Sequence, residues 1–325
     1  MARSAGGPRR SLLVERTAAT FDLRADEALE LLSAVQGPSF RTNPLRGAPP
    51  GPAGLDALAG RLPAGPIEPY PWIGEGFAFD GPTHELSACA AHRSGELFIQ
   101  NPSSFLPVLA LDVQPGHRVL DMFAAPGGKL AHAAARAGGQ ASFVANDRSR
   151  PRLAKLREVL ELLGVEHVEL RADHAEHLAA LLGAERFDRV LVDAQCTGEA
   201  LLDLRRRDEP RAWSLDRVQR FSYLQRKALR VGYGLLRPGG VLVYSTCTYA
   251  PEENELPVDR LLRHTSAHLE PFEVEGLSCP TRPGRTDWAG ERFAGELDHT
   301  LRILPDERFE GFFVARIVKP SDATD

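Results

Sequence analysis

The stretch VLDMFAAPGGKL, from Val119 to Leu130, decides the fold of this chain. An apolar run ends in an acid, a turn of small residues follows, and an Ala-rich segment begins at Leu130. This order predicts a β-strand, a tight turn and the N-terminus of a helix. Gly127 and Gly128 have no Cβ, so backbone N–H groups of the turn can approach a ligand closely. The stretch therefore predicts a ligand-binding turn at the edge of a sheet.

Downstream of this turn, strands and helices are expected to alternate. Further strands are expected at 142–149, 168–173, 187–194, 241–247 and 311–318, with helices at 150–163 and 215–236. No helix is expected after the last strand. This order predicts an α/β fold with a doubly wound, mostly parallel sheet and an antiparallel strand at the C-terminal end.

The pattern differs towards the N-terminus. Residues 11–36 show helical periodicity, and residues 46–71 are rich in Gly, Pro and Ala. We expect an N-terminal helical and loop-rich region at 1–70, forming a small α/β region with the short strands that follow. The main domain is expected at 71–320, with its core from about residue 97, and a tail at 321–325.

Composition excludes several classes of protein. Hydrophobic residues make up 43% and charged residues 26% of the chain, which is ordinary for a globular protein. No apolar run approaches the roughly 20 residues of a membrane span. The net charge of −5 excludes a bulk polycation, so contact with nucleic acid would require a local basic patch. The four cysteines lie far apart in the sequence, which favours the reducing cytoplasm as the location of the protein. We also expect the protein to be a monomer.

Four of the predicted strands end in an acid. These residues are Asp121, Asp147, Asp173 and Asp193. Acids that cap the following helices would explain one such residue, but explain four at one edge less well. In doubly wound sheets the ligand binds outside the carboxyl ends of the strands. The acids therefore predict a ligand site at that edge.

Two nucleotide-binding motifs are excluded as explanations of the glycine turn. A phosphate-binding P-loop requires Gly where Phe123 stands and Ser or Thr where Leu130 stands. The G-x-G-x-x-G pattern of a dinucleotide fold is absent as well. S-adenosylmethionine has no pyrophosphate and needs no such cradle. Asp147 is suited to hold its ribose hydroxyls, and Asp173 to face its adenine.

Five motifs in a fixed order resemble one known family. Asp121 with AAPGGK, then Asp147, Asp173, DAQCTG (193–198) and STCTYAPEENE (245–255) are similar to the Sun-type (RsmB/RsmF-like) RNA cytosine-5 methyltransferase family. The resemblance covers roughly residues 95–318, and RTNPL (41–45) and the terminal RILP and GFFVAR segments are also similar to family segments.

The resemblance implies a Rossmann-like class I methyltransferase. S-adenosylmethionine would be the methyl donor, no metal would be needed, and RNA would be the substrate, with rRNA favoured over tRNA. The donor site would comprise Phe123, Ala124, Ala125, Pro126, Gly127, Gly128, Lys129, Asp147, Arg152, Asp173 and Asp193.

Cysteine suits the implied chemistry. Carbon 5 of cytosine is a weak nucleophile, but a thiolate that adds to carbon 6 makes carbon 5 enamine-like. Cys196 and Cys247 each follow a predicted strand, and chemistry alone does not separate them. The resemblance implies that Cys247 is the nucleophile and that Cys196 assists product release. It also implies that Asp193 contacts the cytosine ring, with Lys129 near enough to orient Asp193 or lower a thiol pKa.

One position departs from the family pattern. The family has Asp-Ala-Pro-Cys-Ser-Gly, and here Gln195 replaces the proline. Proline fixes φ and shapes the loop that aims the next side chain. The replacement of this proline by Gln195 should therefore affect the role of Cys196 in product release more than methyl transfer itself.

Arginines follow the Cys196 loop closely. Arg205, Arg206, Arg207 and Arg211 form the stronger cluster, and Arg217, Arg220, Arg226, Lys227 and Arg230 continue along the next predicted helix. The alternatives are a solvated helix face and an edge that follows RNA phosphates. The spacing of His84, Cys89 and His92 matches no zinc pattern, so we expect no metal.

Two other functions compete with RNA methylation. A catalytically silent RNA-binding or ribosome-assembly factor would explain the departure at Gln195, but not the retention of Cys247 and Asp193. A small-molecule methyltransferase would leave the arginines and the paired cysteines without a purpose.

Overall fold

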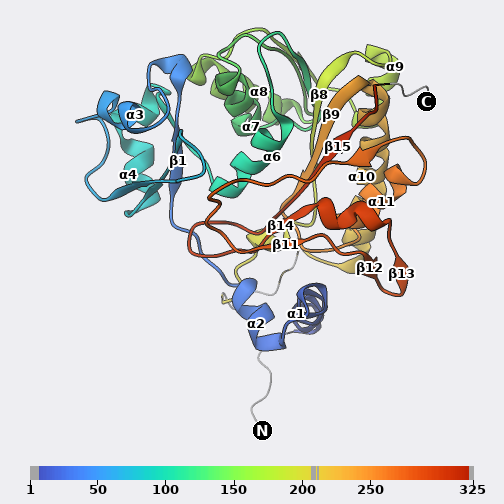
Figure 1. The fold of residues 1–325 in the computed structure, drawn as a ribbon. Helices are drawn as coiled ribbons and strands as arrows, with labels where there is room; N and C mark the ends of the chain where they lie inside the picture. The colour runs from blue at the N-terminus through green and yellow to red at the C-terminus, as the bar shows by residue number, and fades with distance from the viewer. Residues whose placement is uncertain (1–6, 206–209, 211, 322–325) are drawn as a thin grey trace.

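The computed structural model describes residues 7–205, 210 and 212–321. Within them, a nine-stranded sheet forms the centre of the molecule, with the order β11-β14-β15-β9-β8-β5-β6-β7 and β10 paired to β15 (Figure 1). Five strands form the parallel part of the sheet: β5 (Arg118–Asp121), β6 (Ser142–Asn146), β7 (Val168–Arg171), β8 (Phe187–Asp193) and β9 (Leu236–Thr246). Four pair antiparallel: β10 (His268–Leu269), β11 (Thr281–Pro283), β14 (Leu301–Ile303) and β15 (Phe312–Val318).

The expected doubly wound α/β sheet is thus confirmed, with a larger antiparallel part than expected. Only β15 was predicted there, because β10, β11 and β14 have two or three residues each, too few to show a period of two. The long helix α10 (Leu215–Leu235) ends one residue earlier than expected. The RPGG segment that follows belongs to β9, where Gly239 has a φ of 74°.

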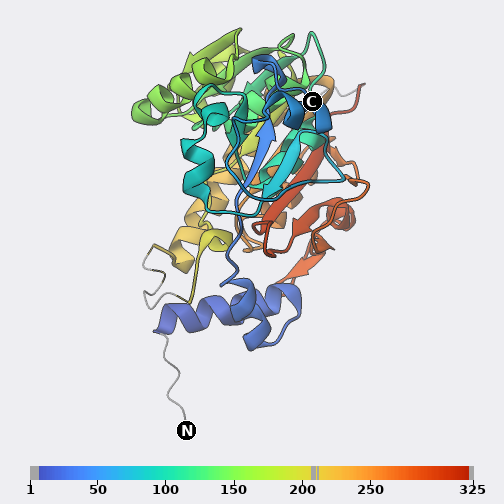
Figure 2. The ribbon, with the colours of Figure 1, turned by 90° about the vertical axis from the view of Figure 1, so that its left-hand side faces the viewer.

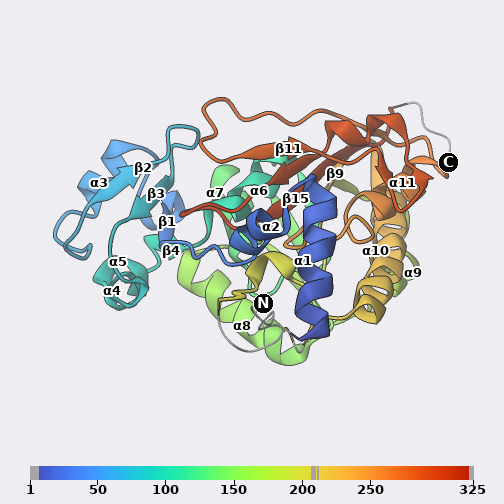
Figure 3. The ribbon, with the colours of Figure 1, turned by 90° about the horizontal axis from the view of Figure 1, so that it is seen from below.

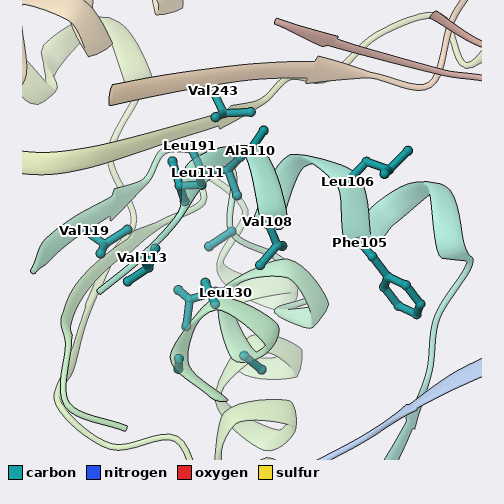
Figure 4. Packing of buried hydrophobic residues seen from close by; sticks show 14 of the residues in the cluster. Phe105, Leu106, Val108, Ala110, Leu111, Val113, Val119, Leu130, Leu191 and Val243 are labelled. Carbon is teal, nitrogen blue, oxygen red and sulfur yellow. The ribbon is translucent and has the colours of Figure 1, made fainter. Parts of the chain in front are cut away.

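Alternate residues of the central strands face two different helix layers. Leu191 of β8 and Val243 of β9 pack with α6 (Leu106–Leu111), α7 (Gly128–Arg136) and α8 (Arg150–Leu163), as Figure 4 shows for part of this cluster. Val190 and Leu242, their neighbours in sequence, pack with α9 (Leu178–Leu182), α10 and α11 (Glu255–Leu262). Both faces of the parallel strands are therefore buried, as a doubly wound sheet requires.

A second, antiparallel sheet lies beside α7 and α8 (Figure 1). Its order is β2 (Ile67–Pro69), β3 (Gly76–Phe79), β1 (Ser39–Thr42) and β4 (Leu97–Ile99). Three short helices accompany it: α3 (Pro52–Ala57), α4 (Thr83–Ala88) and α5 (Ala90–Arg93). The expected domain boundary between residues 70 and 71 falls between β2 and β3, inside this sheet.

The first two helices pack elsewhere. α1 (Pro8–Phe21) and α2 (Ala25–Leu31) lie at one end of the molecule, beside the segments that follow β8 and β9 (Figures 2 and 3). Their shared apolar cluster consists of Leu13, Phe21, Leu32, Ala200, Leu204, Trp213, Val218, Tyr249, Ala250 and Leu304. A small hairpin of β12 (Asp287–Trp288) and β13 (Glu291–Arg292) completes the structure. The N-terminal helices thus cover the carboxyl-end edge of the sheet.

Candidate active site

The four predicted acids lie at one edge of the sheet. Asp121 ends β5 and Asp193 ends β8, whereas Asp147 follows β6 directly and Asp173 comes two residues after β7. Because these strands are parallel neighbours, their carboxyl ends are adjacent. The sheet topology therefore brings together side chains that are far apart in sequence.

A cavity of about 420 Å³ opens at this edge. Its lining residues are Phe123, Asn146, Asp147, Arg148, Ser149, Arg152, Asp173, Ala175 and Gln195. Four predicted donor-site residues, Phe123, Asp147, Arg152 and Asp173, are among them. The turn from Ala124 to Gly128 is not part of this lining, and Lys129 and Asp193 lie instead beside the two cysteines.

Asp147 offers an unused acceptor to a ligand. Its carboxylate is buried, and Oδ1 accepts a hydrogen bond from the Ser149 backbone N–H at 2.9 Å. Oδ2 lies 2.8 Å from Nη1 of Arg152 as an ion pair, but receives no hydrogen bond. A buried carboxylate oxygen without a donor is suited to a ligand hydroxyl. Asp147 therefore places a carboxylate with one oxygen free of hydrogen bonds at this cavity.

Asn146 was missed from the sequence, although it organises this cavity. Its buried Nδ2 donates to the carbonyls of Met122 and Asp173, each at 3.1 Å. Its Oδ1 accepts from the Asp173 backbone N–H at 3.0 Å. One side chain thus joins the segments after β5 and β7. Its position next to Asp147, at a strand end, was the available signal.

The glycine turn has no room for side chains. Gly127 has a φ of 112°, and a Cβ there would lie 2.7 Å from Cδ1 of Leu156. A Cβ on Gly128 would lie 2.9 Å from Cε1 of Phe98. The helix α7 begins at Gly128, so its first N–H groups have no acceptor within the helix.

Backbone contacts fix the rest of the turn. The Ala124 N–H donates to the carbonyl of Asn146 at 2.8 Å. The peptide bond between Ala125 and Pro126 is cis. Nη2 of Arg152 donates to the carbonyl of Ala125, so the arginine that pairs with Asp147 also holds the turn. The turn and the acid after β6 therefore form one unit.

Asp121 supports the glycine turn with its buried carboxyl group. It is buried, and its Oδ1 accepts from the Phe123 backbone N–H at 3.2 Å. Burial, together with the nearby charge of Asp193, raises the pKa of Asp121 to about 7. A carboxyl group with this pKa, enclosed by protein, shapes the turn instead of contacting a ligand.

Lys129 and Asp193 form an ion pair beside the cavity. Nζ of Lys129 lies 2.7 Å from Oδ2 of Asp193, and the Ser245 hydroxyl donates to Oδ1 at 2.8 Å. Burial lowers the pKa of Lys129, but the charges of Asp193 and Cys247 outweigh it and raise that pKa overall. Ser245 was missed as a partner, although it belongs to the recognised STCTYAPEENE motif. Asp193 is thus held with both oxygens oriented.

The two cysteines of the recognised motifs are in contact. Sγ of Cys196 lies 3.4 Å from Sγ of Cys247, and both residues are partly exposed. The contact with Cys247, burial and the charge of Glu253 raise the pKa of Cys196 well above its usual value. Cys196 therefore stays a thiol and can donate a proton to its neighbour.

The Cys247 loop rests on a buried ion pair. Arg302 donates to both oxygens of Glu255, at 2.6 and 2.5 Å. Its Nη1 also donates to the carbonyl of Tyr249 at 3.0 Å, and Asn254 donates to the carbonyl of Thr248 at 2.9 Å. These bonds explain the polar PEENE segment, because its side chains fix the turn after β9.

The Cys196 loop is held by different groups. Nε2 of Gln225 donates to the carbonyl of Gln195 at 3.0 Å and to Oε2 of Glu253 at 3.1 Å. The same Oε2 accepts from the Thr197 backbone N–H at 3.0 Å. Burial raises the pKa of Glu253 to about 8 against the effect of these bonds. Side chains from α10 and from the Cys247 loop thus hold a loop that lacks proline.

The other predicted groups lie apart from this site or outside the described residues. Arg205 is exposed, and its Nε lies 3.2 Å from Asp203. Arg206, Arg207 and Arg211 lie outside the described residues. Sγ of Cys89 accepts from the His92 backbone N–H at 3.4 Å, as a helix cap. Among the described residues, no three His, Cys, Asp or Glu side chains are grouped to hold a metal.

The fold and this edge define an enzyme of the class I methyltransferase type. The family model described as 16S rRNA methyltransferase RsmB/F matches residues 108–318. The chain belongs to this family of methyltransferases. As for membrane association, no helix in the described part of the chain has the length and apolar character of a span.

Relatives include proteins named for tRNA and for rRNA. The chain is 36% identical over 256 residues to the tRNA (cytosine(49)-C(5))-methyltransferase of Pyrococcus abyssi, covering 78% of this chain and 80% of that protein. It is 36% identical over 305 residues to the ribosomal RNA small subunit methyltransferase F of Salmonella heidelberg, covering 90% of this chain and 60% of that protein. The chain thus spans less than two thirds of the methyltransferase F relative.

Solved structures share the fold along nearly the whole chain. A methyltransferase homolog protein from Pyrococcus horikoshii has a TM-score of 0.79 and 30% identity, covering 96% of this chain and 99% of that one. NSun6 from Pyrococcus horikoshii, determined with SFG, has a TM-score of 0.76 and 23% identity, covering 98% and 99%. The agreement extends beyond the residues that the family model matches.

Proposed function

We propose that this protein methylates carbon 5 of cytosine in RNA, using S-adenosylmethionine and a covalent bond between Cys247 and the base. The contact between the thiols of Cys196 and Cys247, beside the Lys129–Asp193 pair, carries the proposal. The relative named for cytosine C5 methylation of tRNA, covered over 80% of its length, supports the assignment of the methylated atom.

The donor would bind in the cavity at the ends of β6 and β7. Asp147 would accept hydrogen bonds from the ribose hydroxyls through its unused Oδ2. Asp173, whose backbone is held by Asn146, would face the adenine. The donor supplies an electrophilic methyl group on a sulfonium. The close packing of Gly127 and Gly128 against Leu156 and Phe98 would hold the turn in place beside the donor.

Cys247 would begin the reaction. Its thiolate adds to carbon 6 of cytosine, which makes carbon 5 nucleophilic towards the donor methyl. Asp193 would contact N3 or N4 of the ring, because Lys129 and Ser245 orient its carboxylate. After transfer, a carbon–carbon bond joins the methyl group to carbon 5.

Release then restores the aromatic ring. The proton on carbon 5 leaves to solvent, the bond between carbon 6 and sulfur breaks, and Cys247 departs as a thiolate. Cys196 would assist this step, because its raised pKa keeps a proton on a thiol 3.4 Å from the departing sulfur. A proton donor beside a leaving group lowers the barrier to its departure.

We propose rRNA over tRNA as the substrate, acted on in the cytoplasm. The Salmonella heidelberg relative named for small-subunit rRNA aligns with 90% of this chain, which supports this choice. The target cytosine must be unstacked to reach a thiol, so it would lie in a single-stranded or splayed segment.

Incubation with methyl-labelled donor and either rRNA or tRNA, followed by digestion to nucleosides, tests the proposal. We expect labelled 5-methylcytidine from rRNA. Label on tRNA alone would refute the choice of substrate, and label in neither RNA would refute the function. Donor binding, measured by calorimetry, separates an enzyme from a silent RNA-binding factor, because such a factor would bind RNA without binding donor.

A further inference from the structure

A second pocket lies between α10 and the end of α11. Its volume is about 280 Å³. Its lining residues are Tyr223, Arg226, Lys227, Arg230, Arg260, Leu261, His264 and Thr265. Four of these residues are cations, in a chain whose net charge is −5. We call it the α10–α11 pocket.

Part of its positive charge has no carboxylate partner. Lys227 pairs with Glu176 at 3.4 Å, and Arg260 pairs with Glu291. No ion pair joins Arg226 or Arg230 to a carboxylate among the residues that the structure describes. Nε of Arg226 is also buried without a hydrogen-bond partner. An uncompensated pair of arginines at a pocket favours an anionic ligand.

An exposed aromatic side chain stands at the same pocket. Tyr223 is 50% exposed, although tyrosine on a helix normally packs its ring against protein. Nζ of Lys227 lies 4.6 Å from the ring centroid, and Cζ of Arg226 lies 5.9 Å from it. An exposed ring between cations is the arrangement by which proteins bind single strands of nucleic acid, stacking a base and pairing its phosphate.

The α10–α11 pocket flanks the candidate active site. One helix connects them, because Gln225, between Leu224 and Arg226, holds the carbonyl of Gln195. Lys227 also lines a smaller cavity of about 110 Å³. That cavity shares Phe123 and Gln195 with the donor cavity. A strand whose cytosine reaches Cys247 therefore has a short path along α10.

We propose that the α10–α11 pocket binds the RNA strand next to the target cytosine. A phosphate pairs with Arg226 and Arg230, and an unstacked base lies on Tyr223. This subsite rests on the proposed function, since it requires an RNA substrate. A free anion would use the arginines but would leave the exposed ring of Tyr223 without a role.

The double variant Arg226→Gln/Arg230→Gln tests the phosphate contact. We expect KM for RNA to rise roughly tenfold, kcat to stay within about twofold, and the salt slope of binding to fall by about 1 per lost phosphate contact. Tyr223→Ala should raise KM roughly tenfold with no change in salt slope, because stacking carries no charge. The matched control is Lys155→Gln/Arg157→Gln on α8, which removes the same charge from another helix layer.

The outcomes separate this subsite from the proposed function. If the wild-type protein makes 5-methylcytidine and the double variant matches the control in KM and salt slope, the subsite is wrong and the function stands. If the wild-type protein makes none, the function itself fails. Unchanged KM in Tyr223→Ala, with inorganic phosphate competing against RNA, would reduce the pocket to an anion site and refute the stacked base.

Discussion

The two cysteine loops meet at their sulfur atoms but are built differently. After Cys247, the residues Thr248, Tyr249, Asn254 and Glu255 are all buried. The Asn254 side chain donates to the Thr248 carbonyl, and Arg302 donates to the Tyr249 carbonyl and to the Glu255 carboxylate. Around Cys196, by contrast, Gln195 is exposed and Thr197 is partly exposed. One loop belongs to the protein core, and the other lies on its surface.

This difference accords with the roles proposed for the two thiols. A nucleophile must stand at a fixed distance and angle from the base, which a buried loop ensures. A group that assists release acts only after methyl transfer, so its loop can tolerate adjustment. Rigid support under Cys247 and lighter support under Cys196 are therefore expected of this division of labour.

Replacing each cysteine in turn tests the comparison most directly and gives the largest effects. Cys247→Ala should lower turnover by a factor on the order of 10³ or more and form no covalent adduct. Cys196→Ala should instead accumulate a protein–RNA adduct, because addition still occurs and release is impaired. Denaturing electrophoresis with labelled RNA detects the adduct. An adduct in Cys247→Ala, and none in Cys196→Ala, would show that the roles are reversed.

Breaking the ion pair beneath the Cys247 loop should cost much stability. Arg302→Met leaves the buried Glu255 carboxylate unpaired, which should lower the free energy of unfolding by roughly 3–5 kcal/mol. Denaturant titration measures this loss. The matched change in the other loop, Arg205→Met, removes an exposed pair and should cost less than about 1 kcal/mol. Equal losses would contradict the contrast between the loops.

Glu253 joins the two loops and should make stability depend on pH. Its pKa is raised to about 8 in the folded protein, so the folded state binds more protons than the unfolded state between about pH 4.5 and pH 8. The free energy of unfolding should therefore fall as pH rises through this window. Glu253→Gln should make that slope shallower, by up to about 1.4 kcal/mol per pH unit.

Asp121, whose pKa is raised to about 7, should leave a residual slope in the Glu253→Gln variant. Thermal unfolding at a series of pH values measures both slopes. A variant with the slope of the wild-type protein would show that Glu253 is ionised at neutral pH in the folded state.

Restoring the family proline should have the smallest effect. Gln195→Pro restricts the backbone conformations of the unfolded chain and should raise the free energy of unfolding by about 0.4–1 kcal/mol. The carbonyl of residue 195 can still accept its hydrogen bond from Gln225. Methylation and the lifetime of the adduct should stay within about twofold. A marked loss of stability would show that the Cys196 loop has adopted a backbone that proline cannot enter.

The sequence predicted the parts of the molecule that have a local signal. The parallel strands show continuous apolar runs, and α8 was placed with both ends correct because Gly164 caps it. The position of the four acids at one edge of the sheet was predicted from the order of the strands. Asn146, Gln225 and Glu253 were missed, because each acts through a partner far away in the chain, and no local pattern marks such a pair. The surface against which α1 and α2 pack could not be predicted for the same reason.

Because α1 and α2 dock against segments far along the chain, the parts of the molecule assemble in a defined order during synthesis. These helices are made before the central sheet, yet Arg285 donates to the carbonyl of Thr20 across 265 residues of chain, and Leu304 lies in their apolar cluster. Contacts of such long separation form late and slow the rate of folding. Until the segment with Leu304 has been made, the apolar cluster around these helices stays incomplete. The cluster that holds α1 and α2 against the segments after β8 and β9 is therefore completed among the last steps of biosynthesis.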